Sequence, residues 1–188
     1  MQKRFLLKSL VLGALLATTG AMAQDKFKIG LILPMTGPFA STGKQIEAAA
    51  KLYISQNGDM VAGKKVELIV KDDTSAPDVT KRIAQELVVN DKVSVLAGFG
   101  LTPLALATAP IATQSKTPLV VMAAATSSIT EASPFIIRTS FTLPQAAVAL
   151  ADWAPKNNIK KVVTLVSDYG PGIDAEKYFK DRFTFNGG

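Results

Sequence analysis

The hydrophobic residues of this chain fall into short uninterrupted runs separated by longer segments of mixed polarity. The first run, residues 29–33, has the length of a strand and is followed by proline and glycine. Such a run is typical of a strand buried on both faces, as in the middle of a parallel sheet. Similar runs predict later strands at residues 66–70, 93–97, 119–122, 135–138 and 161–166.

Segments with apolar residues at helical spacing fill the gaps between these runs, beginning with residues 44–57. Three helix starts carry capping signals. Residues 75–78 have the order of a capping box that begins at Ser75, Thr102 precedes a proline, and residues 142–145 form a second capping box. Strict alternation of strands and helices predicts an α/β fold with a parallel sheet and right-handed crossovers, of Rossmann or flavodoxin-like type.

The N-terminus has the three parts of a secretory signal peptide. Residues 1–8 are basic, residues 9–20 are apolar, and residues 21–23 supply the small side chains that precede a cleavage site. The apolar part is shorter than the roughly 20 residues that a membrane-spanning helix requires. We therefore expect residues 1–23 to be a signal peptide, cleaved between Ala23 and Gln24, and the mature protein to be periplasmic.

The composition excludes most catalytic chemistry on this chain. The sequence has no histidine and no cysteine, which rules out Ser-His-Asp and Cys-His machinery, disulfides, and zinc sites of thiolates or imidazoles. Pro103 stands where a dinucleotide-binding fingerprint that begins at Gly98 would need its third glycine. We accordingly expect no enzyme activity, no cofactor and no metal. The formal net charge of +6 is not gathered into a basic cluster with interleaved aromatics, so no nucleic-acid partner is expected.

Asp72 and Asp73, at the end of the second predicted strand, allow two interpretations. Adjacent carboxylates can be half of a metal or acid–base site. However, neighbouring side chains on a strand point to opposite faces, and carboxylates at this position commonly accept hydrogen bonds from backbone N–H groups of the next helix. The sequence favours the second, structural role.

What remains is a binding site built from loops at the carboxyl ends of the strands. In an open parallel sheet, ligands bind where the strand order reverses, which we expect between the first and third predicted strands. Helix N-termini, hydroxyls and small side chains there suit a carboxylate or amide oxygen. The candidate ligand-binding residues are Phe39, Thr42, Phe99, Leu101, Thr102, Ala124, Ala125, Thr126 and Tyr169. Thr102 and Phe99 have structural alternatives, as a helix cap and as a core residue.

Five motifs follow one another in a specific order along the chain. They are Lys28–Ala40, Asp72-Asp73, Gly98–Thr102, Ala123–Ser127 and Ser167–Gly172. Together they resemble the leucine/isoleucine/valine-binding proteins, which are periplasmic solute-binding components of ABC transporters. The resemblance implies a type I periplasmic binding fold, in which two α/β lobes, each a parallel sheet flanked by helices, are joined by a hinge. Residues 24–140 would form lobe one, and residues 141–188 would form the start of an incomplete lobe two.

The same resemblance implies roles for individual residues. Thr102 matches the hydroxyl residue that holds the carboxylate or amino group of the ligand. Residues 124–126 match the loop of backbone groups and hydroxyls beside it. Thr42 matches a side chain that overlies the ligand, and Tyr169 matches a tyrosine of lobe two that closes on it.

Two departures from the family pattern bear on the ligand class. Pro103 follows Thr102 where amino-acid binders commonly have a serine, so one N–H donor is missing. The acidic residue that pairs with the ammonium group of an amino acid falls beyond Gly188. The family's ligands include aliphatic amino acids, amides, urea and aromatic carboxylates. The missing donor, together with aromatic side chains that can wall the site, slightly favours an aromatic carboxylate without an α-amino group.

The leading hypothesis is a periplasmic receptor that binds a small carboxylate- or amide-bearing solute, an amino acid or an aromatic acid, between two lobes. It would deliver the solute to a permease in the inner membrane, as a monomer when full length. A sensory receptor of the same fold is an alternative that the sequence leaves open. An exported enzyme is disfavoured by the missing histidine and cysteine. Because much of lobe two would lie beyond Gly188, we expect the isolated chain to be marginally stable and prone to aggregate.

Overall fold

The computed structural model describes residues 26–188, so the predicted signal peptide and its cleavage position lie outside it. The described residues form a six-stranded sheet of order β2-β3-β1-β4-β5-β6. Its strands are β1 (Lys26–Leu33), β2 (Met60–Val61), β3 (Lys64–Asp72), β4 (Val95–Gly98), β5 (Leu119–Val121) and β6 (Ile136–Arg138). All neighbouring strands are parallel except β2 and β3. The predicted α/β class is therefore confirmed, and β2 is a short antiparallel edge strand that the sequence pattern missed.

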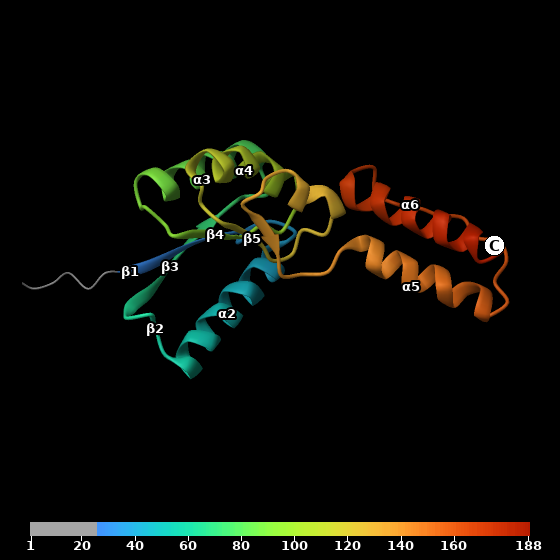
Figure 1. Ribbon diagram of the computed structural model, residues 1–188, viewed down its shortest axis with the longest axis horizontal. Coiled ribbons are helices and arrows are strands. Elements are labelled where there is room, and N and C mark those ends of the chain that lie inside the picture. Colours follow the sequence, from blue (N-terminus) through green and yellow to red (C-terminus); the bar gives the residue numbers. More distant parts are fainter. Residues whose placement is uncertain (1–25) are drawn as a thin grey trace, which may run out of the picture.

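Helices cover both faces of this sheet, with α2 on one side and α3 and α4 on the other (Figure 1). The helices are α2 (Ala40–Asn57), α3 (Pro77–Val89), α4 (Thr102–Ser115), α5 (Leu143–Lys156) and α6 (Gly170–Phe185), with a 3₁₀ helix, η1 (Ser127–Glu131), between β5 and β6. The first of them, α2, begins at Ala40, ahead of the predicted start at residue 44.

The central strand β1 is buried on both faces, as its apolar run predicted. Ile32 belongs to the larger hydrophobic core beneath α3 and α4. Leu31 and Leu33 belong to the smaller core on the side of α2. None of the three is more than 2 % exposed. Because full burial of such a side chain is worth roughly 1.5–3 kcal/mol, this alternation fixes both helix layers to one strand.

The strand order reverses between β1 and β4. The chain leaves β1 through α2 towards β3, and it leaves β4 through α4 towards β5 on the opposite side. The loops that follow these two strands lie together, since a Cβ atom placed on Gly100 would lie 3.0 Å from Cγ of Pro34. The predicted switch point between the first and third predicted strands is therefore confirmed.

One of the predicted helix caps forms, and two are wrong. At the start of α5, the N–H of Thr142 donates to Oε1 of Gln145 at 2.8 Å, which completes the predicted capping box. At α3 the N-cap is Ala76, because Ser75 has a left-handed φ of 57° and its N–H donates to Oδ1 of Asp73 at 2.7 Å. Thr102 is the first residue of α4 rather than its cap.

The predicted strand at residues 161–166 is also wrong. No backbone group of residues 160–166 hydrogen-bonds to another backbone group within residues 26–188. A strand requires a neighbour, and this stretch has none beside it among the described residues. Its apolar side chains are consequently left open to solvent, with Val163 94 % and Leu165 99 % exposed.

The last two helices, α5 and α6, lie side by side and project away from the sheet (Figure 1). A third hydrophobic core joins them, in which the rings of Phe179 and Phe183 stack at 5.4 Å between centroids. A groove of about 340 Å³ runs between these helices and residues 162–166. None of the helices within residues 26–188 is long and apolar enough to cross a membrane.

Candidate functional site

Two threonines meet at the carboxyl edge of the sheet. The Oγ1 atoms of Thr102 and Thr126 lie 2.7 Å apart and share a hydrogen bond, and both residues are about 95 % buried. They meet because β4 and β5 are neighbouring parallel strands, whose following loops reach the same edge. The hydrogen bond of the Thr102 hydroxyl goes to Thr126, and the N-cap of α4 is Leu101. The capping alternative for this residue is therefore wrong, and its side chain is directed at Thr126 instead.

This pair can recognise an oxygen-bearing group. When one hydroxyl donates to the other, the second proton and several lone pairs remain available. The pair also lies at the first residue of α4, where unpaired backbone N–H groups and the helix dipole favour a carboxylate. Pro103 lacks an N–H, so this helix start offers one donor fewer than usual.

The start of α6 covers the threonine pair. A Cβ atom placed on Gly170 would lie 2.8 Å from Oγ1 of Thr126 and 3.4 Å from Cγ2 of Thr102. Glycine is therefore the only residue that fits here without displacement. Tyr169, the N-cap of α6, is 40 % exposed beside this contact. Three segments that are distant in sequence thus converge on one point.

The other candidates near the pair serve the fold through their backbones. Ala124 is buried, and its N–H donates to the carbonyl of Phe99 at 3.0 Å. The carbonyl of Ala125 accepts the N–H of Leu143 at 3.0 Å, which ties this loop to the start of α5. Leu101 is the N-cap of α4. These contacts hold the loop after β5 in place around Thr126.

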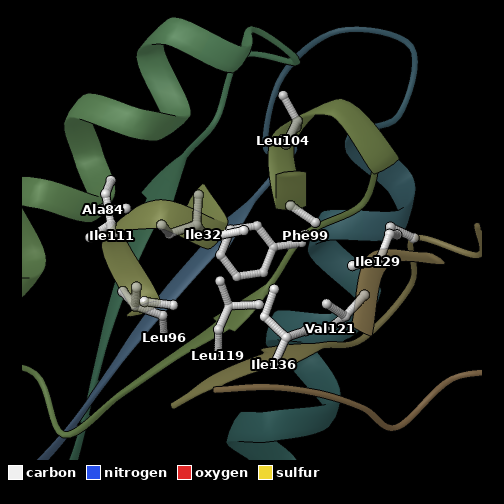
Figure 2. Close-up of a cluster of buried hydrophobic side chains, with 14 of the residues drawn as sticks. Ile32, Ala84, Leu96, Phe99, Leu104, Ile111, Leu119, Val121, Ile129 and Ile136 are labelled. Atoms are coloured by element: carbon white, nitrogen blue, oxygen red, sulfur yellow. The ribbon is translucent and has the colours of Figure 1, made fainter. Parts of the chain in front are cut away.

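The three remaining predicted residues differ in where they lie. Phe99 is fully buried in the larger core, where its ring lies among Ile32, Leu119 and Ile136 (Figure 2). It takes the core position that the sequence offered as its alternative. Phe39 is 44 % exposed as the N-cap of α2, and Thr42 is half-buried in the first turn of the same helix. Both lie at the carboxyl end of β1, on the other side of the switch point from Thr126.

Two charged residues that the sequence did not single out contact this loop. Nη2 of Arg138, at the end of β6, donates to the carbonyl of Thr126 at 2.5 Å. The N–H of Ser127 donates to Oδ2 of Asp174, in α6, at 2.6 Å. Burial lowers the pKa of Arg138, and the carboxylate of Asp174 opposes that shift. The position of Arg138 at the carboxyl end of a predicted strand is the signal that could have marked it.

Asp72 and Asp73 act as hydrogen-bond acceptors for nearby loops. Asp72 accepts the N–H of Met35 at 2.9 Å and the hydroxyl of Thr36 at 2.6 Å, and so ties the loop after β1 to the end of β3. Within residues 26–188, no group of three or more acidic, histidine or cysteine residues is placed to hold a metal ion. Asp72 also accepts the N–H of Thr74, and Asp73 accepts that of Ser75, so both carboxylates accept backbone hydrogen bonds as predicted, but from loops rather than from α3.

The family described as "Periplasmic binding protein" matches residues 26–188. The Leu/Ile/Val-binding protein homolog 6 of Brucella abortus is 47 % identical over 174 residues, which cover 92 % of this chain and 44 % of that protein.

Solved structures with the same fold include solute-binding proteins of ABC transporters from Rhodopseudomonas palustris. One, from strain BisB5 in complex with 3,4-dihydroxy benzoic acid, is 66 % identical with a TM-score of 0.85 and covers 87 % of this chain and 45 % of that one. Another, in complex with 4-hydroxybenzoate, is 46 % identical with the same TM-score and the same coverage. The chain thus spans less than half the length of the relatives that it matches.

Proposed function

Because the chain belongs to the periplasmic binding protein family, we propose that it is part of the solute-binding component of an ABC transporter. In this role it binds a small solute and delivers it to a permease in the inner membrane. Export through the predicted signal peptide at residues 1–23 places it in the periplasm. The missing histidine and cysteine fit a receptor that binds its solute without transforming it.

The solute that we propose is an aromatic carboxylate of the hydroxybenzoate type. The observation that carries this proposal is the buried hydrogen bond between Thr102 and Thr126 at the switch point, beneath the start of α6. These hydroxyls would hold the carboxylate of the solute. The 66 % identity to a protein bound to 3,4-dihydroxy benzoic acid supports the aromatic class. Pro103 also stands where amino-acid binders of this family commonly have a serine, which fits a solute other than an amino acid.

Binding in this proposal takes place between two lobes. Residues 24–140 form lobe one, which supplies Thr102, Thr126 and the start of α2 with Thr42 and Phe39. Residues from 141 onward belong to lobe two, which supplies Tyr169. A hinge near residue 140 allows the lobes to close over the solute, as in other two-lobed binding proteins.

Calorimetric titration of the natural protein that carries these residues tests the proposal. We expect binding of 4-hydroxybenzoate and 3,4-dihydroxybenzoate and no measurable binding of leucine. Thr102→Val leaves the Thr126 hydroxyl unpaired in a buried site, so we expect it to weaken hydroxybenzoate binding about tenfold or more.

Thr108→Val is the matched control for this experiment. Thr108 lies in the same helix and is fully buried, but its hydroxyl donates to the carbonyl of Leu104 at 3.0 Å. We expect this variant to bind like the wild type. Leucine binding without hydroxybenzoate binding would refute the solute class, and equal affinity of the Thr102→Val variant and the wild type would remove Thr102 from the site.

A further inference from the structure

The peptide group between Thr126 and Ser127 is held by two opposite charges. Its carbonyl oxygen accepts a hydrogen bond from the Arg138 guanidinium, and its N–H donates to the Asp174 carboxylate. Both contacts therefore belong to one rigid planar unit. The cation is at the oxygen end of the peptide dipole and the anion is at its N–H end, which is the favourable orientation for both.

Hydrogen bonds of this kind constrain geometry more strongly than neutral ones. A hydrogen bond with an ionised partner is roughly twice as strong as one between neutral groups, and bonds in a chain polarise one another. Fixing this peptide plane restricts ψ of Thr126 and φ of Ser127. The direction of the Cα–Cβ bond of Thr126 is restricted with it, which limits where the hydroxyl can lie relative to Thr102.

The two charges come from different parts of the molecule. Arg138 ends β6 in the sheet, whereas Asp174 lies in α6, 47 residues after Ser127. In the same arrangement, Gly170 at the start of α6 lies against Thr126. The contact to Asp174 therefore depends on the position of α6, whereas the contact to Arg138 does not.

The guanidinium of Arg138 has an N–H donor that no other described residue accepts. Its Nε atom is buried and has no hydrogen-bond partner among the described residues. Burying a guanidinium with an unpaired donor is unfavourable, so the residue is not explained by stability alone. Its bond to Thr126 is the contact that a positioning role requires.

We infer that Arg138 and Asp174 are positioning residues that clamp the Thr126–Ser127 peptide and so link the position of α6 to the orientation of the binding hydroxyl. This inference rests on the proposed function for its effect on solute binding. It predicts that loss of either charge loosens the peptide and speeds dissociation of the solute.

Amide hydrogen exchange and stopped-flow kinetics test the clamp in the natural protein. We expect Asp174→Ala and Arg138→Gln to raise the exchange rate of the Ser127 amide and the dissociation rate of 4-hydroxybenzoate about tenfold. Arg138→Lys keeps the charge but lacks the planar donor group. We expect its exchange and dissociation rates to lie between those of the wild type and those of Arg138→Gln. The control is Asp181→Ala, since Asp181 is in α6 but pairs with Lys177 at the surface.

The two readouts separate the clamp from the proposed function. The exchange rate needs no solute, so a changed Ser127 amide supports the clamp even if hydroxybenzoates do not bind the wild type. Unchanged exchange in Asp174→Ala overturns the clamp. Faster exchange with unchanged dissociation of a solute that does bind overturns the positioning role.

Discussion

Asp72 and Asp73 are adjacent in sequence, yet folding moves their pKa values in opposite directions. Burial alone would raise the pKa of Asp72, but hydrogen bonds from the Thr36 hydroxyl and from nearby backbone N–H groups hold it below its ordinary value. Burial raises the pKa of Asp73, and the neighbouring charge of Asp72 adds to that effect. Asp73 is fully buried, and its Oδ2 atom has no partner in the described part of the chain.

These shifts predict opposite pH responses for two isosteric variants. The folded state prefers a protonated Asp73, so its contribution to stability is lost as the pH rises from the unfolded pKa of about 3.9 through the folded pKa. Asp73→Asn removes that loss, so we expect its stability relative to the wild type to rise as the pH increases from about 3.9 towards neutral. Asp72 stabilises the fold in its charged form, and this stabilisation develops as the pH rises to about 3.9, so the stability of Asp72→Asn relative to the wild type is expected to fall over that acidic range.

Urea denaturation of both variants and the wild type across both pH ranges measures the difference. Each variant serves as the control for the other, since the two remove the same charge at neighbouring positions. Slopes of the same sign would contradict the assigned pKa directions.

At the scale of residues, the sequence indicated types of side chain better than their roles. The threonines at 102 and 126 were found because hydroxyls in loops after neighbouring strands are visible in the pattern. The hydrogen bond between them was not predicted, because a threonine before a proline is equally typical of a helix cap. The core position of Phe99 depends on its left-handed φ of 65°, which turns the ring inward and which no sequence rule assigns to phenylalanine.

Among the elements, α6 is the one whose position matters most to the site. Its first residue, Gly170, leaves no room for a side chain against Thr126. We expect Gly170→Ala to destabilise the protein by about 1–2 kcal/mol in urea denaturation, because the added methyl overlaps the threonine. At a helix start without this contact, the same substitution would be neutral or stabilising.

Ile173→Ala provides the control for this helix. Ile173 is 55 % exposed, and its truncation is expected to change stability by no more than about 0.5 kcal/mol. If Gly170→Ala proved as stable as the wild type, the close packing of α6 on the threonine pair would not exist in solution.

Five of the six predicted strands were confirmed because each has a neighbour in the sheet. The pattern at residues 161–166 is as apolar as the others, but hydrophobicity reports burial and not pairing. Without a partner strand among the described residues, the segment forms no backbone hydrogen bonds and is not a strand. The edge strand β2 was missed for the converse reason, since its two residues are both exposed and carry no periodic signal.

For the whole molecule, the consequence of this single segment is self-association. Val163 and Leu165 are almost fully exposed, and the backbone around them is unpaired, which together make an open template for another strand. We expect residues 24–188 to associate as concentration rises in sedimentation velocity experiments. A double variant, Val163→Lys with Leu165→Lys, is expected to remain monomeric.

The matched control places a lysine elsewhere on the surface. Val89, at the end of α3, is 68 % exposed and distant in sequence from the unpaired segment. We expect Val89→Lys to associate like the wild type. A wild-type chain that stays monomeric at every concentration would contradict the role of the open segment.

Because Gly170 packs directly against Thr126, the position of α6 can select solutes by their thickness. In the proposed function, a solute that binds between the threonine pair and α6 would displace the start of the helix, by a distance that the thickness of the solute sets. A flat ring needs the smallest displacement, whereas a branched aliphatic side chain needs a larger one. The fold would then favour planar solutes because they require a smaller displacement of α6, in addition to any contacts that the ring makes.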